Sequence, residues 1–221
     1  MNRKVQTFDL TILAMFLAII IAMASVPFLG YIYIPLLALR ATLLHIPVII
    51  ASIVLGAKYG AILGFAFGLT SLITNSTAPV ATSFVFSPFV PVEGLGLGAS
   101  RWLSLIICFV PRILVGVVPH YVYRGLSRLL REKKGGVELV PLTVAGIAGS
   151  LTNTILVMGG IYLFFGSTYA QAKEVAFGDL FMYIVNSVIL INGVPEALVA
   201  AILTTAVAKA LLVYKRKKIW K

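Results

Sequence analysis

Acidic residues are scarce in this sequence, and so are charges of any kind. Its 221 residues include 7 Asp and Glu against 18 Lys and Arg, and only 11% of positions are charged while 60% are hydrophobic. The mean hydropathy is +1.05. So few polar side chains cannot cover the surface of a water-soluble globule. The composition therefore excludes an ordinary soluble domain and predicts a membrane protein.

Residues that build metal sites, disulfides and common catalytic motifs are scarce as well. The single cysteine, Cys108, excludes an internal disulfide and a cysteine metal cluster, and His45 and His120 have no clustered partners. The chain has no G-x-x-x-x-G-K-[ST] phosphate loop, no H-E-x-x-H and no G-x-S-x-G. We therefore expect no enzyme, no cofactor in this chain and no ATP hydrolysis by the chain itself.

Long apolar runs predict an all-α integral membrane protein that forms a single membrane domain over residues 1–221. A spanning helix needs about 20 apolar residues, so the chain has room for six. The predicted spans are residues 10–29, 36–55, 59–75, 102–123, 139–165 and 181–208. The second contains Arg40, His45 and Pro47, which predict irregular first turns. Residues 76–100 are too polar to span and too apolar for a solvated loop, so we expect them to form a cap.

The positive charges predict the orientation, because cytoplasmic loops of membrane proteins concentrate Lys and Arg. Thirteen of the 18 lie in the N-terminal tail, at Lys58, in residues 124–134 and in the C-terminal tail. The opposite loops hold only Arg40, Arg101 and Lys173. The pattern predicts six helices with both termini in the cytoplasm and the cap outside. Orientation and attraction to anionic lipid then explain the basic residues, and a nucleic-acid partner is not needed.

Two stripes of small residues indicate close helix packing, because small side chains let helix backbones approach each other in lipid. Glycines recur at every fourth position from Gly56 to Gly68, and we expect them to pack the third helix against its neighbours. Ala14, Ala18 and Ala22 form a similar stripe on the first helix. The alanine stripe fits internal packing and a partner interface equally well.

Arg112 and Glu196 are the ionisable residues that lie deepest in the predicted spans. Intramembrane charges are costly and mark functional sites by default. Pro111 precedes Arg112, and Pro195 precedes Glu196, so each lies where a proline leaves a backbone carbonyl free. Two readings stay open: the residues form a structural ion pair, or they face a cavity that holds an anionic or multiply hydrogen-bonding solute.

Further polar and aromatic residues favour a cavity that opens to the outside. Buried amides need hydrogen-bond partners, and four asparagines fall on the third, fifth and sixth spans. Arg101 lies at the outer end of the fourth span, and cap aromatics including Phe89 are candidate lid residues. The predicted substrate-binding residues are Asn75, Phe84, Phe86, Arg101, Arg112, Asn153, Asn186, Asn192 and Glu196.

The whole chain resembles the substrate-binding S component of an energy-coupling factor (ECF) vitamin transporter. The resemblance is carried by the alanine stripe, by residues 43–61 as the hairpin between the second and third helices, and by residues 110–116 and 192–197. It implies a subunit of the bacterial cell membrane that captures a vitamin from outside. The first helix, through Ala14, Ala18 and Ala22, would bind a transmembrane coupling subunit that works with two ATPase subunits, and these would use the ATP.

Residues 82–89 make the chain most similar to the pantothenate-specific members of that family. Pantothenate is a small anion with an amide and two hydroxyls. Either Arg101 or Arg112 would take its carboxylate, and Glu196 would accept a hydroxyl hydrogen bond or hold Arg112 in place. Two alternatives remain: an S component for a hydroxymethylpyrimidine or pyridoxine-like vitamin, and a stand-alone solute channel or facilitator.

Overall fold

A computed structural model describes residues 3–26, 30–34, 39–90, 97–130 and 139–219, with the backbone alone described at 3–6, 31–34, 39–41, 97–101 and 218–219. Helices make up most of these residues. The helices are α1 (Arg3–Ser25), α2 (His45–Leu55), α3 (Ala57–Thr77), α4 (Leu97–Val115), α5 (Val118–Leu129), α6 (Leu139–Ala172), α7 (Leu180–Tyr183) and α8 (Val194–Ile219). They are joined by strands β1 (Tyr31–Ile34) and β2 (Leu39–Thr42), the 3₁₀ turns η2 (Ser83–Val85) and η3 (Phe177–Asp179), and a π-helix, η4 (Ile184–Gly193).

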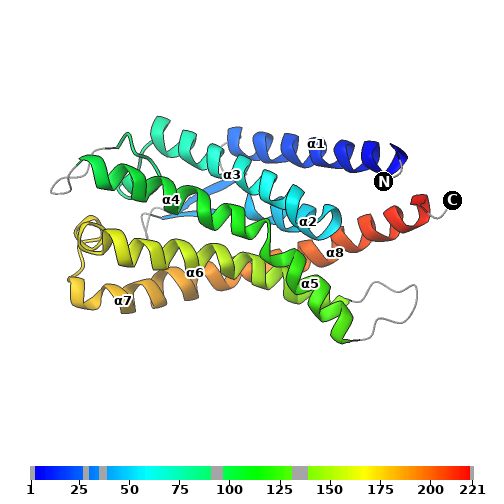
Figure 1. Ribbon diagram of the computed structural model, residues 1–221. Helices are drawn as coiled ribbons and strands as arrows, with labels where there is room; N and C mark the ends of the chain where they lie inside the picture. The colour runs from blue at the N-terminus through cyan, green and yellow to red at the C-terminus, as the bar shows by residue number, and fades with distance from the viewer. Residues whose placement is uncertain (1–2, 27–29, 35–38, 91–96, 131–138, 220–221) are drawn as a thin grey trace.

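The long helices run roughly along one axis and leave the chain termini at the same end of the bundle (Figure 1). The start of α1 and the end of α8 lie at this end, which we call the terminal end. The turn η2, the start of α4 and the short helix α7 lie at the opposite end, which we call the cap end. The two termini and the turn η2 thus lie at opposite ends of the bundle.

Within the described residues, five helical stretches are long and apolar enough to cross a membrane. They are Thr7–Ser25, Ala57–Thr77, Trp102–Leu129, Leu139–Ala172 and Phe177–Lys217. The prediction of a helical, multi-pass membrane protein is confirmed by these stretches.

The predicted second span, residues 36–55, is wrong as a continuous helix. Strands β1 and β2 form an antiparallel hairpin in which Tyr31 pairs with Thr42 and Ile34 with Leu39. The 11 residues of α2 reach only about 16 Å, well short of a bilayer core of about 30 Å. Alternating Tyr and Ile in residues 31–34 favour a strand. The paired backbone hydrogen bonds of the hairpin satisfy groups that a helix would otherwise satisfy.

The other boundaries differ from the prediction in smaller ways. The fourth span starts inside the predicted cap, continues helically through Pro111 and breaks at Gly116 and Val117, before Pro119. The fifth extends to Ala172 through non-helical dihedral angles at Phe165. The sixth span contains a ten-residue π-helix that ends at Gly193, two residues before Pro195.

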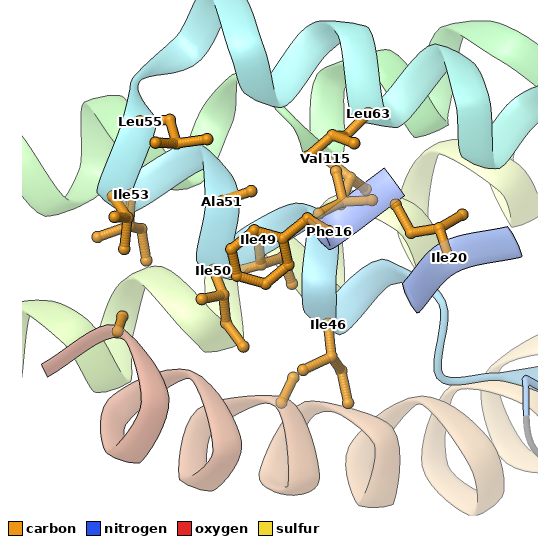
Figure 2. Close-up of a cluster of buried hydrophobic side chains, with 14 of the residues drawn as sticks. Phe16, Ile20, Ile46, Ile49, Ile50, Ala51, Ile53, Leu55, Leu63 and Val115 are labelled. Atoms are coloured by element: carbon orange, nitrogen blue, oxygen red, sulfur yellow. The ribbon is translucent and has the colours of Figure 1, made fainter. Parts of the chain in front are cut away.

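Helix α2 is the centre of the larger hydrophobic cluster. Every residue from His45 to Leu55 is buried, and α2 contacts α1, α3, α5, α6 and α8. Helix α1 packs its Phe16 and Ile20 into this cluster (Figure 2). Burial of aliphatic side chains on all sides explains why such a short helix stays in place.

The glycine stripe packs α3 against α4, as predicted. A Cβ added at Gly60 would collide with the carbonyl oxygen of Gly116, and one at Gly64 would collide with that of Arg112. A Cβ at Gly68 would lie 2.7 Å from the Phe109 ring. Each glycine one turn further along α3 therefore contacts a residue about one turn earlier in the chain on the α4 side. The two backbones are in direct contact.

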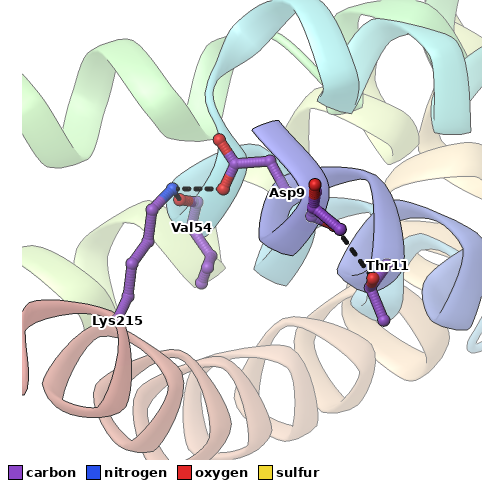
Figure 3. Close-up of polar contacts among 5 residues, drawn as sticks. Asp9, Thr11, Val54 and Lys215 are labelled. Atoms are coloured by element: carbon purple, nitrogen blue, oxygen red, sulfur yellow. Dashed lines mark hydrogen bonds and ion pairs between the residues drawn. The ribbon is translucent and has the colours of Figure 1, made fainter. Parts of the chain in front are cut away.

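A polar clip joins three helices near the terminal end. The Nζ of Lys215 on α8 lies 2.8 Å from Oδ1 of Asp9 on α1 and donates to the carbonyl oxygen of Val54 on α2 at 3.1 Å (Figure 3). The Asp9 side chain is only 9% exposed. A carboxylate this well buried needs its cation.

Replacing Lys215 by Met is expected to lower the melting temperature of the purified protein, because it leaves the Asp9 charge buried without its counterion. Loss of one partner from a buried pair costs about 3–5 kcal/mol. The partial exposure of Lys215, 18%, places the loss at the lower end of that range. The double variant Asp9→Asn, Lys215→Met should recover much of the loss. Equal melting temperatures for the wild type and Lys215→Met would contradict the clip.

Candidate functional site

A cavity with apolar walls and several polar groups lies between the cap and the middle of the bundle. Its volume is about 90 Å³, and its walls come from β2, α3, the cap, α4, α6, η4 and α8. Its lining residues are Thr42, Ser71, Asn75, Val80, Thr82, Phe86, Arg112, Asn153, Thr154, Val157, Met158, Ile161, Tyr169, Val188, Asn192, Gly193 and Glu196. A mainly apolar cavity with a few converging polar groups is the usual form of a small-molecule site.

Arg112 places a positive charge in the cavity wall at a residue that is only 4% exposed. Its guanidinium carbon lies 4.7 Å from the centroid of the Phe86 ring and 5.4 Å from that of Phe67. Both rings attract the cation through their negative faces. One of its nitrogens also lies 3.5 Å from Oγ of Ser71.

A second hydrogen bond of Arg112 depends on the proline beside it. Its Nη1 donates to the carbonyl oxygen of Ile107 at 2.9 Å. In a regular helix that carbonyl would accept from the N–H of residue 111, but Pro111 has none. Pro111 thus leaves the Ile107 carbonyl free to accept, and this carbonyl holds the Arg112 guanidinium.

The cap is held over the cavity by hydroxyl and amide groups. Ser83 donates to Oδ1 of Asn75 at 2.8 Å, and Asn75 in turn donates to the Ser71 carbonyl at 2.8 Å. Ser104 on α4 donates to the carbonyl oxygen of Phe84 at 2.7 Å. Asn75 therefore lines the cavity and also fastens the cap to α3.

Two lining residues of α6 bury polar atoms without a hydrogen-bond partner in the described part of the chain. The atoms are Oδ1 of Asn153 and the hydroxyl of Tyr169. Buried polar atoms almost always have partners. A bound molecule with hydroxyl or amide groups would supply them.

Glu196 and Arg112 line the same cavity but are held by different groups. Glu196 Oε1 accepts a hydrogen bond from the backbone N–H of Thr42 at 3.0 Å, while Arg112 is held by Ile107 and the aromatic rings. The hairpin thus fixes the carboxylate, and α4 fixes the guanidinium. This arrangement favours the interpretation that both charged residues face a solute-binding cavity over the interpretation that they form a structural ion pair.

Lys173 adds positive charge near one cavity wall. It follows the end of α6, and its Nζ lies 5.6 Å from the centroid of the Tyr169 ring. Burial lowers the pKa of Lys173 to about 8. Because that value is still above 7, most of the lysine stays protonated at neutral pH.

The structure brings six of the nine predicted binding residues to the cavity: Asn75, Phe86, Arg112, Asn153, Asn192 and Glu196. Asn186 is exposed. Residues six positions apart do not share a helix face, so Asn186 cannot line the cavity together with Asn192. Phe84 is 5% exposed and packs its ring against Phe165 at 5.8 Å, so it is a core residue where a lid residue was expected. Arg101 lies in α4, and its side chain is outside the described residues.

The sequence reasoning missed several polar lining residues. Ser71 lies one helical turn before Asn75, so helix periodicity could have found it. Thr154 is adjacent to Asn153, and helix periodicity does not place adjacent residues on one face. Thr42 was not considered as a lining residue, because it was assigned to the predicted second spanning helix. Tyr169 lies beyond the predicted end of the fifth span and had no local signal.

The alanine stripe faces away from the bundle. Ala14, Ala18 and Ala22 are all exposed, whereas Ile12, Phe16 and Ile20 on the opposite face of α1 are buried. Internal packing therefore does not explain these alanines.

Comparison with known proteins gives a consistent result. The family model described as "ECF transporter, substrate-specific component" matches residues 8–208. The chain is 40% identical to the pantothenic acid transporter PanT of Lactococcus lactis subsp. cremoris over 95% of its own length and 96% of that protein. It is 26% identical to the pantothenate transporter PanT of Leuconostoc mesenteroides subsp. mesenteroides, with 94% and 93% of the two chains covered.

Members of this family are transport subunits and not enzymes, which agrees with the missing catalytic motifs. The match runs from α1 to α8 and so includes every described residue of the cavity. The chain belongs to the family of substrate-specific components of ECF transporters.

Proposed function

We propose that this chain captures pantothenate in the cavity described above, as the substrate-binding subunit of an ATP-driven importer. The buried guanidinium of Arg112 in a cavity with amide and hydroxyl groups carries the proposal. A guanidinium is the side chain best suited to a carboxylate, because its N–H groups form a planar fork. The names of the two relatives, both pantothenate transporters, support the same substrate.

The charges in the cavity suggest how the substrate is oriented. The carboxylate of pantothenate would bind Arg112 and stay away from the carboxylate of Glu196, which would repel it. Glu196 would accept a hydrogen bond from one hydroxyl of the substrate. The amide and the other hydroxyl would then meet Asn153, Asn192 and Tyr169.

A flat aromatic vitamin fits this cavity less well. Of its aromatic lining residues, Phe86 carries the Arg112 guanidinium over its ring, and Lys173 lies over Tyr169. The rest of the apolar wall is aliphatic, with Val157, Met158 and Ile161. Stacking of a pyrimidine or pyridine ring would have to displace a cation from an aromatic face. The geometry therefore favours pantothenate over a hydroxymethylpyrimidine or pyridoxine-like ligand.

In this proposal the cap end faces the outside of a bacterial cell membrane, and both termini lie in the cytoplasm. The distribution of Lys and Arg supports that orientation. The exposed alanine stripe of α1 would bind the transmembrane coupling subunit. Two ATPase subunits would hydrolyse ATP, and this chain would carry no cofactor of its own.

Two experiments test the proposal. Titration calorimetry with the purified protein should show tight binding of pantothenate and much weaker binding of pyridoxine and hydroxymethylpyrimidine. Tighter binding of either ring compound would overturn the assigned substrate. Radiolabelled pantothenate uptake should require the coupling and ATPase subunits. Flux into liposomes containing this protein alone would indicate a facilitator.

Two asparagines of the same helical region form a matched pair for the site. Asn192→Ala should weaken pantothenate binding about tenfold, because a lost hydrogen bond in a buried site costs about 1.4 kcal/mol. Asn186→Ala should leave the dissociation constant unchanged, because Asn186 is exposed. Equal effects of the two substitutions on the dissociation constant would show that Asn192 does not contact the ligand.

A further inference from the structure

We propose that Pro111 and Gly64 are positioning residues for Arg112, and that through it they set the preference of the cavity for an anionic ligand over a neutral one. Neither residue lines the cavity. The inference rests on the proposed function, because it concerns how the carboxylate of pantothenate is recognised.

Pro111 acts within α4. Because it has no N–H, the carbonyl oxygen of Ile107 stays available, and Nη1 of Arg112 donates to it at 2.9 Å. This bond ties the guanidinium to the backbone of its own helix and fixes the direction of its plane. A guanidinium whose plane is fixed presents its N–H groups in one direction. The Arg112 side chain therefore loses less conformational entropy when a carboxylate binds.

Gly64 acts from α3. A Cβ at this position would collide with the carbonyl oxygen of Arg112 and would lie 2.9 Å from the Cα of Ile113. These are backbone atoms, so the helices would have to separate. The missing side chain of Gly64 therefore sets how far the Arg112 backbone lies from α3.

Other residues of the same α3 face contact the Arg112 side chain. The Phe67 ring centroid lies 5.4 Å from the guanidinium carbon, and Oγ of Ser71 lies 3.5 Å from Nη2. Gly64, Phe67 and Ser71 are spaced three and four residues apart, which places them on one face of the helix. Moving α3 away at Gly64 would move the ring and the hydroxyl away from the guanidinium as well.

Pro111→Ala and Gly64→Ala should differ in their effect on stability but should both lower selectivity. Pro111→Ala restores a backbone N–H that competes for the Ile107 carbonyl, so α4 should be as stable as before or more stable. Gly64→Ala should lower the melting temperature, because backbone atoms must move. Both should loosen Arg112. A role in stability alone predicts no loss of selectivity in the variant that is not destabilised.

The test measures dissociation constants for pantothenate and for panthenol, its neutral analogue in which the carboxylate is replaced by a hydroxymethyl group. For Pro111→Ala and Gly64→Ala we expect the affinity for pantothenate to fall about 10- to 100-fold, as for loss of a charge-assisted hydrogen bond. The affinity for panthenol should change little. The ratio of the two dissociation constants should therefore shrink towards one in both variants.

Gly60→Ala is the matched control. It adds the same methyl group to the same seam, one helical turn away, where the collision is with Gly116. It should lower the melting temperature as Gly64→Ala does but keep the wild-type ratio of dissociation constants. Should Gly64→Ala fail to fold, Pro111→Ala still tests the inference.

The outcomes separate the inference from the proposed function. A wild-type ratio in Pro111→Ala, or a similar loss of selectivity in Gly60→Ala, would overturn the positioning role. A wild-type protein that binds neither compound would overturn the proposed function. A wild-type protein that binds both equally would overturn the preference for an anionic ligand, and with it the inference.

Discussion

Replacing Arg112 by Gln is expected to weaken pantothenate binding by about 100-fold or more, since loss of one partner from a buried, hydrogen-bonded charge pair costs about 2–5 kcal/mol. Gln is the informative replacement, because it keeps a polar amide with two N–H donors but carries no charge. The protein should therefore fold, and the loss should report the missing charge. Titration calorimetry on the purified protein measures it.

Two comparisons sharpen the Arg112 prediction. Panthenol should bind Arg112→Gln nearly as well as it binds the wild type, because it has no carboxylate to lose. Arg124→Gln removes an exposed arginine of α5 and should leave both affinities unchanged. If Arg112→Gln kept the wild-type affinity for pantothenate, the carboxylate would have to bind elsewhere, with Arg101 as the first candidate.

Replacing Ala18 by Trp is expected to reduce pantothenate uptake to the background level without changing pantothenate binding. Ala18 is exposed, so a large side chain does not disturb the packing of this chain. On a surface that fits a partner helix closely, the same side chain prevents the approach of the two backbones. Uptake assays in cells and co-purification with the coupling subunit measure the effect.

Ile19→Trp is the matched control for the alanine stripe. Ile19 is 43% exposed and lies about 100° around α1 from Ala18. This variant should assemble and transport as the wild type does. Normal uptake by Ala18→Trp would show that the coupling subunit binds a different face of the protein.

Most of the helical fold could be predicted because crossing a membrane leaves a strong signal in the sequence. The run before Ser25, the runs that became α3 and α6, and the part of α8 before Lys209 are long, apolar and nearly free of charge. The second predicted span failed because residues 31–34 and 39–42 satisfy backbone hydrogen bonds by pairing as two strands. Sequence hydropathy does not distinguish burial in lipid from burial among other helices.

The candidate site could be predicted only where a residue is costly to bury. Arg112, Glu196 and Asn153 were found because polar groups within an apolar span require an explanation. The prediction that Asn186 lines the cavity failed, because a helix with one face on the protein and one on its surroundings can hold a polar residue on its outer side. The prediction that Phe84 is a lid residue failed, because an aromatic side chain in a cap packs into a core as readily as it covers a ligand.

The late start of α2 has a consequence for Glu196. Thr42 of β2 lines the cavity three residues before α2 begins at His45, and its backbone N–H donates to Glu196 Oε1 at 3.0 Å. In a helix that continued back through residue 42, this N–H would donate to the carbonyl oxygen four residues earlier. The strand therefore supplies a backbone donor to the cavity that a full-length second helix would keep for itself.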